Sequence, residues 1–178
     1  VVRKTGKIGQ ALNFNGSTGY ITTPNIDVTD EITLSVWFKR SVIGTNYTAL
    51  LTEDVAVAGA TNILLRFDQT TNAPYFYVAG PTRSGLINAG AAFTNTNWNH
   101  LVILLSKSQN RFTAYLNGIV YGNDFAPGTV SLSNQGGLLN IGRDNRASSY
   151  FSGSLDDVHV YNRALSAAEI TQLYKMGK

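Results

Sequence analysis

The sequence has 178 residues and contains no cysteine. Disulfide bonds, thiolate metal sites and cysteine nucleophiles are therefore excluded. No apolar run approaches the roughly 20 residues of a membrane-spanning helix, so membrane insertion is not expected. Charged residues make up 14% of the chain, well below the usual fraction of about a quarter, and the net charge is +3. The lysines and arginines are scattered without a basic cluster, so we do not expect nucleic-acid binding.

Helix signals are also nearly absent before Leu165, whereas short β-rich segments recur between turns of Gly, Asn and Thr. Asn117-Gly118 gives the strongest hairpin signal, because both residues tolerate the positive φ of a type I′ turn. Many short strands separated by turns predict an all-β sandwich or jelly roll. The predicted strands are Ala11–Phe14, Tyr20–Thr22, Ile32–Lys39, Ala49–Thr52, Asn62–Asp68, Pro74–Val78, Asn99–Ser106, Arg111–Leu116, Ile119–Asp124, Leu138–Ile141 and Gly153–Tyr161.

The length suits one domain, and hydrophobic residues at 43% are sufficient for a globular core. Because we find no internal repeat, low-complexity tract or linker, a single domain over residues 1–178 is predicted. The chain begins abruptly at Val1 without a signal peptide, which indicates a module from a larger protein.

The segment Gly153–Tyr161 combines a glycine turn, two adjacent acids and a β-rich run. Strict alternation along this strand places Asp156 on the face of Val158 and Val160. A carboxylate among apolar residues must be hydrogen-bonded, paired or bound to a cation. Asp156 is therefore the leading metal-ligand candidate.

Beyond this strand, Ser166 and Glu169 have the spacing of a capping box. The pattern predicts a helix of about two turns, which is too short to be stable alone. We expect it to dock on the sheet through Ile170, Leu173 and Tyr174. The run Leu101–Leu105 is apolar on both faces, which predicts a central strand covered on each side, with a loop over its outer face.

Six sequence blocks follow one another along the chain: Gly6–Gly16 with Tyr20-Ile21, Glu31–Lys39, Asn97–Val102, Ala114–Gly118, Leu139–Gly142 and Phe151–Ser166. In this order they resemble the laminin-G-like, concanavalin A-like jelly-roll superfamily, over residues 6 to 174. The resemblance implies a two-sheet antiparallel jelly-roll sandwich, all-β with one short C-terminal helix. Such modules are commonly attached to secreted bacterial glycoside hydrolases, polysaccharide lyases and adhesins. Trp37 and Trp98 lie inside these blocks, so we interpret both as packing residues.

The resemblance also implies a structural calcium where the N-terminal loop meets the last strand. The acid of the family's Gly-x-Leu-Asp pattern falls on Asp156. The N-terminal block often reads Phe-Asp-Gly, whereas this chain has Phe14-Asn15-Gly16, but Asn and backbone carbonyls also bind calcium. We therefore predict a calcium site of Asp156, Asn13, Asn15 and Gly16. The alternative is that Asp156 accepts hydrogen bonds from loop amides without a metal.

Two tyrosines suggest a sugar-binding surface. Alternation along Pro74–Val78 places Tyr75 and Tyr77 on one face of a strand and Phe76 and Val78 on the other. Aromatic rings stack on the C–H faces of sugars while nearby polar groups bond the hydroxyls. The alternative is that these tyrosines simply cover the sheet.

The segment 143–150 concentrates charged, amide and aromatic side chains in a chain that is otherwise poor in charge. It precedes the last strand, where it can overhang the concave sheet, and Arg66 and Arg83 are candidates for the same rim. Arginine and asparagine suit recognition of hydroxyl or carboxylate groups. The alternative is a solvated loop with an internal Arg–Asp pair. The predicted carbohydrate-binding residues are Tyr75, Tyr77, Arg66, Arg143, Asn145, Arg146 and Tyr150.

Catalysis is not expected. Jelly-roll glycoside hydrolases use two carboxylates about 5–9.5 Å apart, carried by closely spaced acids on a central strand. The glutamates here are Glu31, which opens a strand, Glu53, and Glu169, which caps a helix. No Ser/His/Asp order, phosphate loop or zinc spacing appears, and no catalytic residue is predicted.

These observations predict a secreted or cell-surface module, tethered to other domains, that binds a polysaccharide through a concave sheet face and rim loops. Calcium is its one expected cofactor. The alternatives are a protein-binding or adhesion module and a structural spacer packed on a neighbouring catalytic domain.

Overall fold

The computed structural model describes residues 1–24, 30–43, 48–54, 61–78, 95–109, 111–125, 137–144 and 149–178. The elements are β1 (Val2–Thr5), β2 (Gln10–Asn15), β3 (Ile21–Thr23), β4 (Glu31–Arg40), β5 (Thr48–Asp54), β6 (Thr61–Phe67), β7 (Pro74–Val78), β8 (Asn99–Ser106), β9 (Arg111–Leu116), β10 (Ile119–Phe125), β11 (Leu138–Ile141), β12 (Arg143–Asp144), β13 (Ser149–Tyr150), β14 (Ser152–Tyr161) and α1 (Ala167–Met176).

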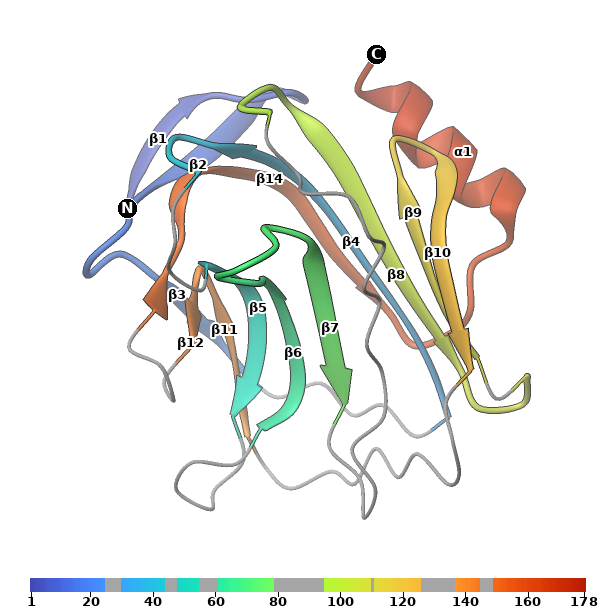
Figure 1. The fold of residues 1–178 in the computed structure, drawn as a ribbon. Helices are drawn as coiled ribbons and strands as arrows, with labels where there is room; N and C mark the ends of the chain where they lie inside the picture. The colour runs from blue at the N-terminus through green and yellow to red at the C-terminus, as the bar shows by residue number, and fades with distance from the viewer. Residues whose placement is uncertain are drawn as a thin grey trace.

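The strands form two large antiparallel sheets, and one curves over the other (Figure 1). In the part of the chain that the structure describes, sheet A has seven strands in the order β1-β2-β14-β4-β8-β9-β10. Sheet B there has five strands in the order β3-β11-β5-β6-β7, and β12 and β13 form a separate small ladder. This is the predicted two-sheet sandwich with one C-terminal helix.

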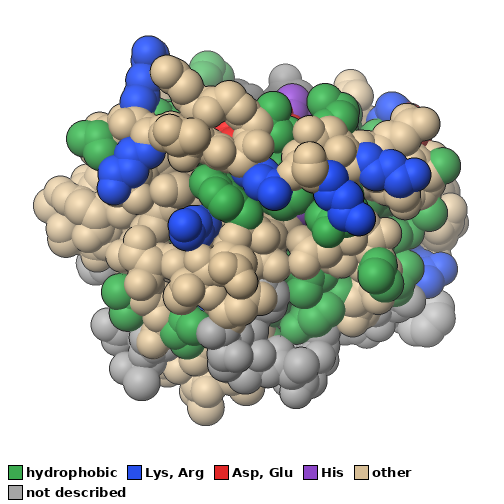
Figure 2. Space-filling model, turned by 90° about the horizontal axis from the view of Figure 1, so that it is seen from above, with side chains coloured by type: hydrophobic (Ala, Val, Ile, Leu, Met, Phe, Trp, Pro, Cys, Tyr) green, Lys and Arg blue, Asp and Glu red, His purple; other side chains and the backbone are tan. Residues whose placement is uncertain are grey.

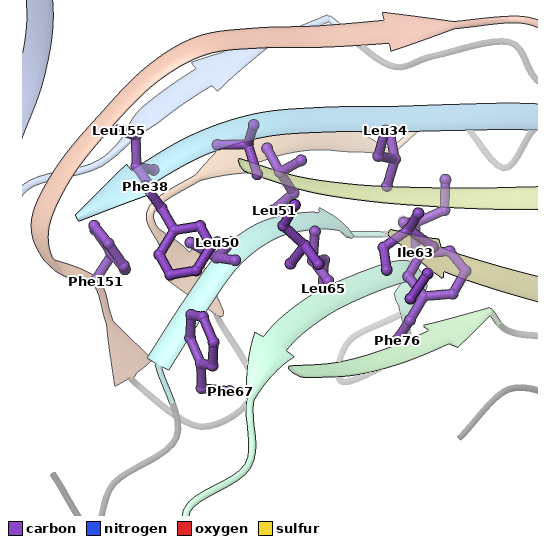
Figure 3. Packing of buried hydrophobic residues seen from close by; sticks show 14 of the residues in the cluster. Leu34, Phe38, Leu50, Leu51, Ile63, Leu65, Phe67, Phe76, Phe151 and Leu155 are labelled. Carbon is purple, nitrogen blue, oxygen red and sulfur yellow. The ribbon is translucent and has the colours of Figure 1, made fainter. Parts of the chain in front are cut away.

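The main hydrophobic core fills the space between the two sheets. Leu34 and Phe38 of β4 meet Leu51, Leu65 and Phe76 of sheet B, and all five side chains are fully buried (Figure 3). Complete burial of a side chain of this size contributes about 1.5–3 kcal/mol. Inward-facing residues alternate with outward-facing ones along the strands, so the outer faces of both sheets are left to carry other functions.

Strand β8 is apolar on both faces because it separates two hydrophobic clusters. Leu101, Ile103 and Leu105 belong to the main core, whereas Val102 and Leu104 form a second cluster on the outer face of sheet A. Helix α1 covers this second cluster, chiefly with Ile170, Leu173 and the preceding Leu165. The prediction of two covered faces is confirmed, but the cover is the helix and not a loop.

Helix α1 begins at the predicted capping box. The Ser166 hydroxyl accepts a hydrogen bond from the Glu169 amide, and the Glu169 carboxylate accepts one from the Ser166 amide. The helix has 10 residues, somewhat more than the predicted two turns. Tyr174 stacks on Trp37 of β4 with ring centroids 5.6 Å apart, as the predicted docking requires. Within the described residues no helix is long and apolar enough to cross a membrane.

Strand β14 contains a bulge that overturns one prediction. Asp156 pairs with Trp37, but His159 pairs with Ser35, so β14 has one extra residue between these pairs. Asp157 adopts a positive φ of 49° at this point. As a result Asp156 points outward beside Trp37, while Val158 and Val160 pack on the core. The predicted shared face of Asp156, Val158 and Val160 is wrong, because strict alternation does not hold across a bulge.

Each predicted strand is present within two residues of its expected bounds. The Asn117-Gly118 turn joins β9 and β10 with φ values of 54° and 78°, which confirms the hairpin. Strand β1 was not predicted, because all its residues are exposed and show no alternation. It lies at the edge of sheet A, where it pairs with β2.

Candidate functional site

The outer face of sheet B carries the two tyrosines that were predicted to contact sugar. Tyr75 pairs with Arg66 of β6 and Tyr77 pairs with Leu64, while Phe76 points into the core. Tyr75 and Tyr77 are both partly exposed, so the predicted alternation along β7 is correct. Because β7 is the last strand of sheet B, these rings lie at the edge of the sheet. We call Arg66, Tyr75 and Tyr77 the β6–β7 surface.

Arg66 fixes the position of Tyr75 on this surface. Its guanidinium lies 5.0 Å from the centre of the Tyr75 ring, and its Nη1 lies 3.6 Å from Asp144 Oδ2. The Asp144 side chain is completely buried and that of Arg66 is 15% exposed. A buried carboxylate needs such a partner, so this ion pair holds the guanidinium against the ring. Arg66 thus orients the tyrosine and is itself mostly withdrawn from solvent.

A second aromatic cluster surrounds Arg143 at the opposite edge of sheet B. The Arg143 guanidinium lies 4.4 Å from the Tyr20 ring centre and 6.0 Å from that of Tyr150. The two tyrosine rings are 6.4 Å apart and tilted by 51°. Tyr20 comes just before β3, and β3 pairs with β11, which leads through Gly142 into β12. We call Tyr20, Arg143 and Tyr150 the β3–β13 cluster.

The structure therefore places the predicted sugar-binding residues in two groups. Asp144 pairs with Arg66 and follows Arg143 directly, so it lies between the β6–β7 surface and the β3–β13 cluster. Tyr20 was missed from the sequence, because its neighbour Arg143 is far along the chain and only sheet pairing brings them together. The predicted residues Asn145 and Arg146, and the rim candidate Arg83, lie outside the described residues.

The four residues predicted to bind calcium do not converge. In the pairing of β14 with β2, Ser152 lies opposite Asn15 and Ser154 lies opposite Asn13. Asp156 is four positions beyond Ser152, which corresponds to about 13 Å along a strand. Calcium takes oxygen ligands at about 2.3–2.6 Å, so Asp156 and Asn15 are too widely separated to share one ion.

The side chains of three of these residues have hydrogen-bond partners within the fold. Asp156 Oδ2 accepts hydrogen bonds from the amides of Lys7 and Ile8, at 2.7 and 2.8 Å. Asn15 Oδ1 accepts the amides of residues 17, 18 and 19, and Asn13 donates to the Gly153 carbonyl. The geometry matches the metal-free alternative, in which Asp156 accepts hydrogen bonds from loop amides. The residues present do not fit the predicted calcium site.

Two of the three glutamates, Glu31 and Glu169, have structural partners. Hydrogen bonds from Ser108, the Ala164 amide and Ser106 hold the pKa of the Glu31 carboxyl below its usual value. Glu169 is bonded to Arg163 and to the helix cap. Within the described residues, no group of three or more His, Cys, Asp or Glu side chains is placed to hold a metal ion.

Trp37 and His100 belong to a packed aromatic stack under the end of helix α1. Their ring centroids are 5.0 Å apart, and Tyr174 covers Trp37 from the helix. Burial lowers the pKa of His100 to about 4, although the nearby Asp157 carboxylate opposes this effect. His100 Nε2 shares a 2.8 Å hydrogen bond with the Ser35 hydroxyl. Trp37 is thus the packing residue that was predicted, whereas Trp98 is partly exposed.

Comparison with known proteins identifies the fold. The family model described as the concanavalin A-like lectin/glucanases superfamily matches residues 15–171. A search of curated proteins found no match.

Solved structures give matches at low identity. Domain 4 of AbnA, an extracellular GH43 arabinanase from Geobacillus stearothermophilus in complex with arabinotriose, has a TM-score of 0.76 and 18% identity, covering 97% of this chain and 80% of that one. The CBM40 of Ruminococcus gnavus IT-sialidase has a TM-score of 0.70 and 14% identity, covering 97% and 98%. The binding domain of Paraclostridial Mosquitocidal Protein 1 has a TM-score of 0.70 and 14% identity, covering 98% and 45%. At these identities the likeness establishes the shared jelly-roll fold.

Proposed function

Since the chain belongs to the concanavalin A-like lectin/glucanases superfamily, we propose that it is a non-catalytic carbohydrate-binding module. Two similar structures support the proposal. One is a domain of an arabinanase in complex with arabinotriose, and the other is the CBM40 of a sialidase. Glu31 and Glu169 form hydrogen bonds that stabilise the fold, and these structural roles are compatible with a binding function.

The observation that carries the proposal is the position of Tyr75. Its ring is partly exposed on the outer face of sheet B, and the Arg66–Asp144 pair fixes its orientation. Tyr77 follows on the same face, at a repeat of about 6.8 Å along the strand. Two phenol rings at this spacing offer apolar faces to sugar C–H groups and hydroxyls to sugar oxygens. An aromatic ring fixed in advance loses little conformational freedom on binding.

The β3–β13 cluster provides a second contact for an extended ligand. Tyr20 is 40% exposed, and the guanidinium of Arg143 contacts its ring and lies near that of Tyr150. Strand β3, which follows Tyr20, lies four strand spacings from β7 in sheet B, or about 19 Å, and the Arg66–Asp144 pair lies between them. A polysaccharide spans this width, whereas a single sugar ring does not. We therefore propose a polymeric glycan as the ligand class. The extracellular arabinanase among the similar structures supports the further proposal of an extracellular module tethered to other domains.

Affinity electrophoresis through gels containing arabinan, xylan or galactan, together with a glycan array, tests this proposal. We expect Tyr75→Ala to weaken binding by about tenfold or more, which corresponds to ~1.4 kcal/mol. Tyr150→Ala should have a smaller effect that grows with oligosaccharide length. Ile119→Ala is the matched control, because this side chain is 73% exposed on a hairpin of sheet A.

Unchanged glycan binding by both tyrosine variants would contradict the proposed surface. Retention of no glycan by the wild-type protein, combined with capture of a protein partner that Tyr75→Ala abolishes, would favour the adhesion alternative. Circular dichroism of each variant confirms that the sandwich is folded.

A further inference from the structure

A polar groove lies on the opposite side of the molecule, on the outer face of sheet A. It encloses about 430 Å³, which falls within the ~300–1,000 Å³ of small-molecule sites. Six of its lining residues, defined here as the lysine groove, are Lys4, Lys39, Trp98, Asn13, Ser154 and Ser41.

Strand register explains why these residues meet. Ser154 of β14 pairs with Asn13 of β2 on one side and with Lys39 of β4 on the other. The next residue, Leu155, points into the core between the sheets. The row Asn13, Ser154 and Lys39 therefore faces outward across three adjacent strands. Lys4 projects beside this row from the edge strand β1.

The lysine groove is positively charged. Lys4 and Lys39 are both exposed, and within the described residues neither forms an ion pair. Lys7 lies close by in the turn between β1 and β2, with its ammonium 5.4 Å from the Trp37 ring. The nearby Asp156 is 6% exposed, and its Oδ2 accepts two main-chain amides and forms no ion pair with these lysines within the described residues. Figure 2 looks down on this face and shows Lys and Arg side chains spread across it, with little acidic surface.

Neutral hydrogen-bonding groups lie between the charges. The Asn13 amide nitrogen donates to the Gly153 carbonyl at 3.0 Å and to the Ser154 hydroxyl at 3.1 Å. These bonds orient the side chains of both residues. They also leave the Asn13 carbonyl oxygen as an acceptor and the Ser154 hydroxyl hydrogen as a donor toward a ligand.

Trp98 supplies the apolar part of the lysine groove. It directly precedes β8, whose first residue Asn99 pairs with Phe38, and it therefore lies next to Lys39. Its indole is partly exposed. An indole face beside two ammonium groups and two hydrogen-bonding side chains matches a sugar ring that carries both hydroxyls and a negative charge.

We propose that the lysine groove binds an acidic saccharide unit, one that carries a carboxylate or sulfate group. This site goes beyond the proposed function, because it lies on the other sheet and selects for charge. The acid pairs with Lys4 and Lys39, the ring contacts Trp98, and the hydroxyls meet Asn13 and Ser154. A polynucleotide is disfavoured because it requires a longer basic track with repeated stacking residues.

Isothermal titration calorimetry with three probes tests this assignment: tri-galacturonate, its methyl ester and a heparin tetrasaccharide. The ester has the same rings and hydroxyls but lacks the charge. We expect tri-galacturonate or the heparin tetrasaccharide to bind, and the ester to bind at least tenfold more weakly than the acid. Lys39→Gln and Lys4→Gln should each weaken acid binding by about five- to tenfold, since one charged contact is lost.

Lys175→Gln is the matched control, because it removes the same charge from the exposed last turn of α1, outside the lysine groove. The affinity of this variant for the acidic saccharide should stay within about twofold of that of the wild type. An equal loss in Lys175→Gln, or equal binding of acid and ester, would overturn the proposal, as would tighter binding of duplex DNA or anionic vesicles with the same lysine dependence. Tyr75→Ala separates the two sites, because it should leave tri-galacturonate binding unchanged. A Tyr75→Ala variant that loses this binding would place the acid on sheet B.

Discussion

Asp156 lies under the turn between β1 and β2, where its carboxylate accepts two main-chain amides. Gly6 of this turn approaches the same carboxylate so closely that a β-carbon at this position would clash with it. The side chain and the turn are therefore mutually dependent. Asp156 fixes the β1–β2 hairpin to the last strand, and this role requires a hydrogen-bond acceptor.

Substitution at Asp156 tests this role. Asp156→Ala should lower the free energy of unfolding by about 2–4 kcal/mol, because two amides lose their acceptor in a largely buried position. Asp156→Asn keeps one carbonyl oxygen and should lose less than half as much. Urea denaturation followed by tryptophan fluorescence measures both. Equal losses in the two variants would show that charge, and not the acceptor, is what matters.

At the scale of elements, helix α1 completes the outer face of sheet A. Val102 and Leu104 would otherwise be exposed in the centre of the sheet, and the helix buries both. Its capping box and the Arg163–Glu169 ion pair define where the helix begins. The helix ends beside Trp37, so the lysine groove occupies the part of the outer face that the helix leaves uncovered.

The helix cap predicts a dependence on pH. Hydrogen bonding to Arg163 first, and to the Ser166 amide and hydroxyl next, lowers the pKa of Glu169 from 4.5 to about 2. Because the folded-state pKa is the lower one, this carboxylate stabilises the fold fully above pH 4.5 and loses its effect as pH falls through about 2. Glu169→Gln should therefore show a smaller fall in Tm than the wild type across this range. Thermal melting at several pH values measures the difference, and parallel curves would contradict the assignment.

At the scale of the molecule, the two sheets present chemically different outer faces. The side of sheet B, with the adjoining β12–β13 ladder, carries tyrosines in contact with arginines, whereas sheet A carries exposed lysines around a groove. The sandwich core separates them, so a substitution on one face should not disturb the other. This separation makes the two proposed binding sites independently testable.

The effect of calcium on the thermal stability of the whole molecule tests the calcium-site prediction. The Asp156, Asn13, Asn15 and Gly16 set does not form one coordination shell, so a chelator should leave the Tm within about 1 °C. Addition of millimolar calcium should have equally little effect, because a ligand stabilises a fold only where it binds the folded state. Differential scanning fluorimetry with EGTA and with calcium gives the comparison. A rise of several degrees with calcium would restore the metal-site hypothesis.

The strands, the hairpin at Asn117-Gly118 and the capped helix could be predicted from the sequence, because each depends on signals from neighbouring residues. The sequence was also sufficient for the orientation of Tyr75, since β7 alternates regularly. The sequence did not predict the orientation of the Asp156 side chain, because no local sequence signal indicates the bulge that follows it. It could not reveal the Tyr20–Arg143 contact or the lysine groove, because strands far apart in sequence contribute to each and only register brings them together.

The bulge at Asp157 also bears on how the last strand can vary in length. The residues of β14 that pair with β4 on either side of the bulge have regular orientations. Asp156 and His159 point outward, and Leu155 and Val160 point into the core. Removing one residue at Asp157 would restore regular pairing with β4 without turning any of these side chains to the other face. The strand can therefore gain or lose this one residue while the core stays the same, so an insertion or deletion here is a permitted step in the divergence of the fold.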